Sequence, residues 1–192
     1  MKGSLTVANL ITSGNLAAGF LALVLAEQGD YAWAAGCVGA AAAFDSIDGL
    51  VARRTHTECE LGSHLDSLAD LVSFGVAPAL IMYLSALHSL PVAGIGACLA
   101  FVLCGAWRLA RFETEEQSRR HFVGLSIPPA GVIAVTLAVW SPPRGLALAI
   151  VLTLSLLMVS RIPFPTLEEL LRPGPLASAG RDREGAGGPE VD

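Results

Sequence analysis

The stretch DSIDGLVARRTHTECELGSHLDSLAD, residues 45–70, decides the fold, because four aspartates stand here within two strongly apolar segments. On a helix, side chains three or four positions apart project from one face. Asp45 and Asp48 therefore share one face, and Asp66 and Asp70 share another. The spacing predicts two helices that turn their acidic faces toward each other across a cleft.

Two glycines flank these acidic faces. Gly49 lies four residues after Asp45, and Gly62 lies four residues before Asp66, so the backbone can approach a ligand there without an intervening side chain. In a soluble protein, acidic pairs at this spacing usually mark a solvated surface. Within a membrane an ionised carboxylate costs about 2.5 to 3.5 kcal/mol, and such a residue indicates a functional site. The apolar setting favours a functional cleft.

The composition indicates an integral membrane protein. Of the 192 residues, 53% are hydrophobic and 15% charged, and the mean hydropathy is +0.60. The net charge of −5 argues against a nucleic-acid partner, which needs a concentrated basic surface. From Pro173 onward the chain is rich in Gly, Pro, Ala and charge. We therefore expect one membrane domain over residues 1–172 and a disordered cytoplasmic tail over 173–192.

Apolar runs predict an all-α protein with six transmembrane helices, each near the roughly 20 residues that a bilayer requires. Residues 12–15, Thr-Ser-Gly-Asn, interrupt the first run near its start, which favours a span over the uniformly apolar core of a secretory signal. The prolines of Ile127-Pro128-Pro129 should bend or unwind the first turns of the fifth helix. The predicted spans are 10–26, 31–54, 62–87, 92–110, 122–140 and 145–159.

The basic residues support this count. Six spans place eleven of the twelve Lys and Arg residues on one side of the membrane and leave only Arg144 opposite. The positive-inside rule then puts both termini in the cytoplasm, at the inner membrane if the source is bacterial. Asp45 lies roughly 13 Å inside the cytoplasmic end of its helix, at 1.5 Å per residue. A cleft at this depth suits a reaction between a lipid and a soluble molecule.

Four clustered carboxylates repel one another unless they are neutralised, and hard divalent cations do this with oxygen ligands. We therefore expect Mg²⁺ or Mn²⁺, with two ions as the predicted number. Such ions share their coordination shell with substrate phosphates and stabilise a leaving phosphate. A remaining carboxylate can take a proton from an attacking hydroxyl, and Arg53 can offset phosphate charge.

Written as D-x2-D-G-x2-A-R-x8-G-x3-D-x3-D, the stretch resembles the signature of the CDP-alcohol phosphatidyltransferases at all eight fixed positions. The resemblance implies six transmembrane helices, usually in a homodimer. It also implies a reaction in which an alcohol attacks the lipid-side phosphorus of CDP-diacylglycerol and CMP leaves.

The resemblance also implies roles for individual residues. Asp45, Asp48 and Asp66 would be metal ligands, and Asp70 would be both a metal ligand and the catalytic base. The implied CDP-lipid site consists of Asp48, Gly49, Ala52, Arg53 and Gly62.

Further segments resemble phosphatidylserine synthases of the membrane-embedded type, which implies serine as the acceptor. Arg108 and Arg111, one helical turn apart at the cytoplasmic mouth, can hold the serine carboxylate by charge-assisted hydrogen bonds. Alternatively, both arginines only follow the positive-inside rule. The resembling segments are 73–79, 108–112, 122–125 and 158–160.

Two alternative functions remain open from the sequence. One is the same reaction with glycerol 3-phosphate or an inositol compound, although a phosphorylated acceptor needs a denser basic pocket than Arg108 and Arg111 provide. The other is a cation transporter that uses intramembrane aspartates as its ion site. A transporter gives no reason for Gly49, Ala52 and Arg53 at these offsets.

Overall fold

The structure, a computed structural model, describes residues 7–55, 60–115 and 125–160, and all regular structure in these ranges is helical. The helices are α1 Val7–Glu27, α2 Tyr31–Thr55, α3 Glu60–Asp70, η1 Leu71–Val76, α4 Ala77–Met82, η2 Tyr83–Leu87, α5 Pro91–Glu115, α6 Ile127–Val139 and α7 Arg144–Val159.

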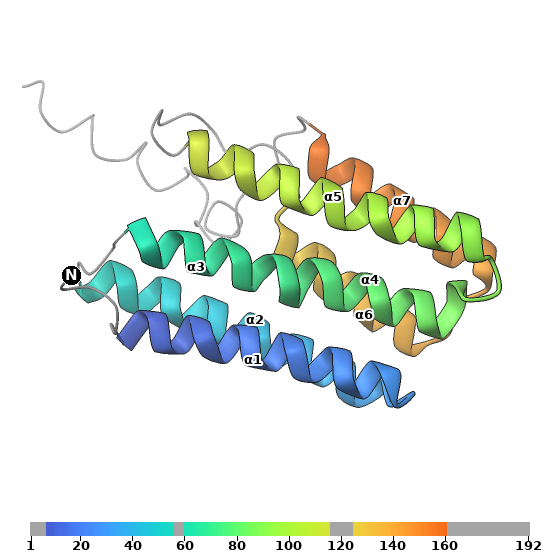
Figure 1. The fold of residues 1–192 in the computed structure, drawn as a ribbon, viewed down its shortest axis with the longest axis horizontal. Helices are drawn as coiled ribbons and strands as arrows, with labels where there is room; N and C mark the ends of the chain where they lie inside the picture. Colours follow the sequence, from blue (N-terminus) through green and yellow to red (C-terminus); the bar gives the residue numbers. More distant parts are fainter. Residues whose placement is uncertain (1–6, 56–59, 116–124, 161–192) are drawn as a thin grey trace, which may run out of the picture.

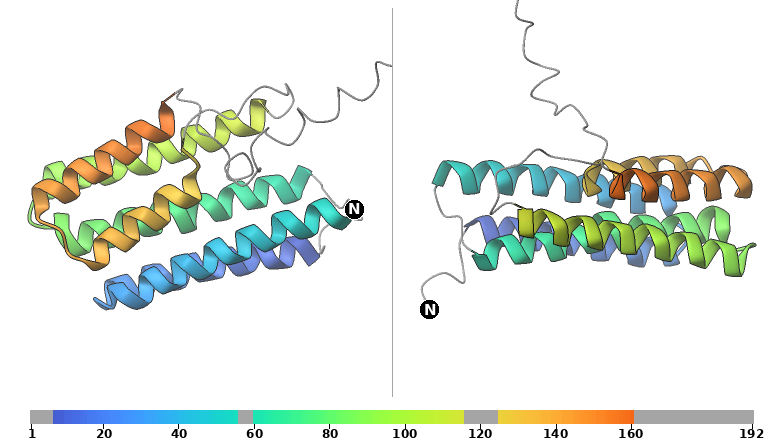
Figure 2. Two further views of the ribbon diagram at one scale, coloured as in Figure 1. Left: turned by 180° about the vertical axis from the view of Figure 1, so that it is seen from behind. Right: turned by 90° about the horizontal axis from the view of Figure 1, so that it is seen from above.

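The elements from α3 to η2 follow one another without a break and form one long rod, in which η1 and η2 are π-helical. The described residues therefore form six helical rods, which lie side by side in a bundle (Figures 1 and 2). This confirms the six predicted helices. The turn between α1 and α2 uses Gly29 at φ 85°, a left-handed conformation that glycine adopts without steric cost.

Four stretches of these helices are long and apolar enough to cross a membrane. The two remaining apolar helices, α6 and α7, are shorter, with 13 and 16 residues. Large apolar side chains such as Phe20, Trp33 and Leu156 are exposed on the outside of the bundle, where lipid can cover them. The chain is thus an integral multi-pass membrane protein. The four stretches are Asn9–Glu27, Tyr31–Val51, Leu61–Leu87 and Pro91–Arg111.

The fifth helix differs from the prediction at its start. Residues 122–124 lie outside the described residues, and Leu125 and Ser126 precede the helix, which begins at Ile127. Pro128 and Pro129 fall in its first turn, where a backbone N–H would have no helical partner and the fixed φ of proline suits the helix. In the predicted span, the described residues before the prolines, Leu125 and Ser126, are thus not helical, which agrees with unwound first turns. The prolines start the helix.

Two glycines bring neighbouring helices close to η1. A Cβ atom on Gly19 of α1 would lie 2.8 Å from the Cα atom of Ser73, and one on Gly131 of α6 would lie 2.6 Å from the carbonyl oxygen of Phe74. Both distances are shorter than real contacts allow. Ser73 and Phe74 are fully buried. The π-helical turn directly after Asp70 is thus tightly packed between α1 and α6.

Replacing Gly131 by alanine is expected to destabilise the protein by about 1 to 3 kcal/mol, because the new methyl group overlaps the Phe74 backbone. Gly39→Ala is the matched control, since a Cβ there meets nothing within 4 Å. The control should leave the melting temperature unchanged or raise it, because alanine favours a helix by roughly 0.5 to 1 kcal/mol. Thermal unfolding in detergent measures both. Equal melting temperatures of Gly131→Ala and Gly39→Ala would contradict the close packing at Gly131.

Candidate active site

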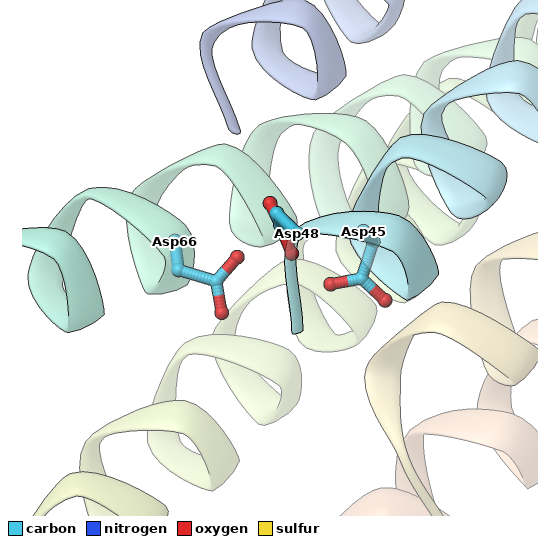
Figure 3. A group of neighbouring side chains, drawn as sticks. All are labelled: Asp45, Asp48 and Asp66. Atoms are coloured by element: carbon cyan, nitrogen blue, oxygen red, sulfur yellow. The ribbon is translucent and has the colours of Figure 1, made fainter. Parts of the chain in front are cut away.

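Three of the four motif aspartates meet between α2 and α3. Asp45 and Asp48 project from α2, and Asp66 projects from α3 toward them (Figure 3). One carboxylate oxygen of each lies within 4.8 Å of those of the other two. The structure thus brings together the two acidic faces that the spacing predicts.

This carboxylate group fits a hard divalent cation. Mg²⁺ binds oxygen at about 2.1 Å in octahedral geometry, so two of its ligand oxygens can be up to roughly 4.2 Å apart. Small side-chain rotations would bring Asp45, Asp48 and Asp66 into this range. The Oδ1 atom of Asp66 is buried and has no hydrogen-bond partner among the described residues. A buried oxygen in this state is suited to a cation, and all three donors are of the type that Mg²⁺ and Mn²⁺ prefer.

Asp70 lies beside this group rather than within it. Its carboxyl group is next to that of Asp45. The residue is buried, with 7% of its surface exposed, and its Oδ1 atom accepts a hydrogen bond of 3.1 Å from Nδ2 of Asn15. The orientation of the Asp70 carboxyl group is therefore restricted by a hydrogen bond within the protein.

The first helix contributes two residues that the sequence reasoning did not assign to the site. Thr12 Oγ1 donates a hydrogen bond of 2.8 Å to Asp48 Oδ2, and Asn15 makes the bond to Asp70. The available signal was two hydrogen-bonding residues three positions apart inside an apolar span. By itself, this polar interruption only favours a span over a signal sequence.

The predicted CDP-lipid residues lie along the same two helices. Gly49 follows Asp48 in α2 and is half-buried, and Gly62 is half-buried in α3 one turn before Asp66. Ala52 and Arg53 belong to the last turns of α2, but their side chains lie outside the described residues.

The two candidate acceptor residues lie on α5. Arg108 is half-buried, and its charge interacts with that of Asp70. Its Nε atom is buried and has no hydrogen-bond partner in the described part of the chain. Arg111 is half-buried one turn further along. The structure thus brings Arg108 toward Asp70, while a role for Arg111 stays a prediction.

By their positions in α1, α2, α3 and α5, these residues lie in the half of the bundle where α2 ends and α3 begins. Figure 1 shows these helix ends together. Asp48 is seven residues from Thr55, and Asp70 is ten residues from Glu60. At 1.5 Å per residue, the carboxylates are about 10 to 15 Å from the helix ends. This depth agrees with the value expected from the sequence.

An acidic cluster at this depth in a bundle of apolar helices indicates a membrane protein with a functional site inside the bundle. Residues 5–162 match the family model described as CDP-alcohol phosphatidyltransferase. The chain belongs to the CDP-alcohol phosphatidyltransferase family.

Relatives from bacteria and archaea cover most of the chain. A CDP-diacylglycerol–serine O-phosphatidyltransferase of Bacillus subtilis is 38% identical over 81% of this chain and 88% of its own length. One from Methanocaldococcus jannaschii is 34% identical over 84% of this chain and 74% of its own. An archaetidylserine synthase of Methanothermobacter thermautotrophicus is 35% identical over 83% of this chain and 70% of its own. These names favour a transferase over a cation transporter.

Proposed function

We propose that this chain transfers the phosphatidyl group of CDP-diacylglycerol to the hydroxyl of L-serine, giving phosphatidylserine and CMP. The observation that carries the proposal is the meeting of Asp45, Asp48 and Asp66 between two helices of a chain whose family transfers phosphatidyl groups. The names of the relatives support serine as the acceptor over glycerol 3-phosphate or inositol compounds.

Asp45, Asp48 and Asp66 would hold Mg²⁺ or Mn²⁺, and Asp70, whose carboxyl group is next to that of Asp45, would complete the proposed site for two ions. Bound there, a divalent ion supplies positive charge to the substrate pyrophosphate and to the leaving phosphate. The half-buried glycines Gly49 and Gly62 leave room for the CDP group beside these carboxylates. Ala52 and Arg53 complete the proposed CDP-lipid site, with the arginine offsetting phosphate charge.

Asp70 is the proposed base. Its carboxylate takes the proton from the serine hydroxyl as the serine oxygen bonds to the phosphorus that carries diacylglycerol. The bond between this phosphorus and the bridging oxygen breaks, and its electrons leave with CMP. Asp70 suits this role because its orientation is fixed by Asn15 and because it stands at the edge of the proposed metal group.

Arg108 is the proposed partner of the serine carboxylate. Its guanidinium lies on the Asp70 side of α5, and its Nε donor is buried without a partner among the described atoms, so a carboxylate there would satisfy it. Arg111 is proposed as a second donor one turn away. The amino acid would then lie between Asp70, which takes its proton, and Arg108, which holds its other end.

The proposed topology places the end of the bundle that holds the acidic site, and both termini, in the cytoplasm. Soluble serine and CMP then exchange with cytoplasmic water, while the lipid substrate and product stay in the bilayer. The homodimer implied by the family resemblance stays a prediction.

Release of CMP tests the proposed function. Purified full-length protein in detergent receives CDP-diacylglycerol, Mn²⁺ or Mg²⁺, and one acceptor: L-serine, sn-glycerol 3-phosphate or myo-inositol. We expect release that depends on serine and on the metal, with phosphatidylserine as the lipid product. Release with only another acceptor would support the same class of reaction and would contradict serine as the acceptor. If folded protein releases no CMP with any of the three acceptors, the proposed enzymatic function is wrong.

Arg108→Gln is expected to raise the KM for serine by about 10- to 100-fold, because a charge-assisted hydrogen bond contributes roughly 1.5 to 3 kcal/mol. The KM for CDP-diacylglycerol should change less than threefold. Arg144→Gln, the same substitution in an exposed residue at the opposite end of the bundle, is the control. An unchanged KM for serine would mean that Arg108 does not bind the serine carboxylate and only follows the positive-inside rule.

A further inference from the structure

We propose that Asn15 is a positioning residue for Asp70, so that the first helix orients the catalytic base. The proposal rests on the proposed function, in which Asp70 takes the proton of the acceptor hydroxyl. It assigns a role in the reaction to α1, a helix that contains none of the residues of the signature motif.

The amide of Asn15 fixes one oxygen of Asp70. Asn15 is fully buried, and its Nδ2 atom donates to Asp70 Oδ1 at 3.1 Å. An ionised carboxylate only accepts hydrogen bonds, so the amide must turn its nitrogen, and not its oxygen, toward Asp70. The other polar neighbour of the Asp70 carboxyl group is the carboxyl group of Asp45. Asn15 thus restricts the orientation of the proposed base from the side of α1.

Asn15 is itself held against the segment that follows Asp70. Ser73 Oγ donates a hydrogen bond of 3.1 Å to the backbone carbonyl of Asn15. Gly19, one turn further along α1, allows the close approach of Ser73. Asp70 and Ser73 are three positions apart and share a face of their rod. One residue of α1 is therefore bonded both to the base and to the turn after it, which restricts the orientation of the base.

A purely structural role explains Asn15 poorly. Its Oδ1 atom is buried and has no hydrogen-bond partner within the described residues. An unsatisfied buried carbonyl costs about 1 to 3 kcal/mol, and an apolar residue of similar size would fill the same space without this cost. Within the described part of the chain, the amide makes one hydrogen bond, which is to Asp70. Among the described residues, the side chain of Asn15 therefore has an energetic cost and one hydrogen bond, which is with the proposed base.

Asn15→Leu tests the proposal in the purified full-length protein, since leucine has a similar shape and no donor. We expect kcat for serine-dependent CMP release to fall about 10- to 100-fold, because small misplacements of a catalytic group have effects of this size. The KM values for serine and CDP-diacylglycerol, and the binding of Mn²⁺, should change less than threefold. Ser13→Ala is the matched control, because Ser13 is an exposed neighbour on α1 that bonds only to the Asn9 carbonyl.

A double-mutant comparison separates positioning from general damage. If Asn15 acts through Asp70, Asn15→Leu should change kcat less than threefold in a protein that already carries Asp70→Asn. An equal loss in both backgrounds, a matching loss of Mn²⁺ or CDP-diacylglycerol binding, or full activity of Asn15→Leu would each overturn the proposal.

A second variant of Asn15 and a parallel assay of the wild type complete the test. If Asn15→Leu does not fold, Asn15→Ala replaces it with the same expected fall in kcat, because alanine also removes the donor and fits within the space of asparagine. Wild-type protein is assayed in parallel with all three acceptors. If the wild type releases no CMP, the proposed function fails. If the wild type releases CMP but the Asn15 variant does not show the expected kinetics, the proposed role of Asn15 is wrong.

Discussion

Asp70→Asn is expected to lower kcat for serine-dependent CMP release by about 10²- to 10⁴-fold, the range that general-base catalysis contributes. Asparagine has nearly the same shape as aspartate, so the helix bundle and the CDP-diacylglycerol site should remain intact, but an amide cannot take the proton. Measurement at saturating Mn²⁺ separates this effect from any loss of metal affinity. Binding of CDP-diacylglycerol, followed as a rise in melting temperature, should persist.

The control for this prediction is Asp30→Asn, the same substitution in the exposed turn between α1 and α2, at the end of the bundle away from the acidic cluster. It should leave the kinetics unchanged. If Asp70→Asn keeps more than about a tenth of wild-type kcat, a smaller loss than general-base catalysis predicts, then Asp70 is not the base.

Asp66→Ala is expected to raise the Mn²⁺ concentration for half-maximal activity by about 100-fold or more. Loss of a residue that only supports a metal ligand costs 10- to 100-fold in affinity, and loss of a ligand itself should cost at least as much. Asp66 is suited to this role because its buried Oδ1 has no partner among the described residues and its carboxylate faces Asp45 and Asp48.

Electron paramagnetic resonance of bound Mn²⁺ measures the affinity directly, without the reaction. Asp30→Asn again serves as the control, since it removes a carboxylate outside the cluster. A wild-type Mn²⁺ affinity in Asp66→Ala would show that this carboxylate is not a ligand. The cluster of three would then need another explanation.

The sequence predicted the features that depend on local periodicity. The length and apolar character of the runs determined six helices, and the three- and four-residue spacing placed Asp45 with Asp48 on one helix face. Charge repulsion between carboxylates in an apolar setting then predicted that the two faces enclose a cation. The cluster of Asp45, Asp48 and Asp66 agrees with this reasoning.

The remaining features depend on contacts between residues far apart in the chain, which periodicity does not report. The bonds from α1 span 36 and 55 positions, so Thr12 and Asn15 looked like interruptions of an apolar run. The π-helical turn after Asp70 packs closely against Gly19 and Gly131, a contact that only the assembled bundle shows. The predicted span over 122–140 followed the apolar run, whereas α6 begins at Ile127, because proline favours the first turn of a helix.

The two hydrogen bonds from α1 also bear on the order in which the protein is made. During synthesis the first helix reaches the membrane before the two helices that carry the aspartates. It therefore offers a hydroxyl to Asp48 and an amide to Asp70 when these later segments enter the bilayer. Polar partners lower the cost of placing a carboxylate among acyl chains. In the folded bundle, the bonds from α1 thus lower the cost of holding these two aspartates among apolar helices, independently of any substrate.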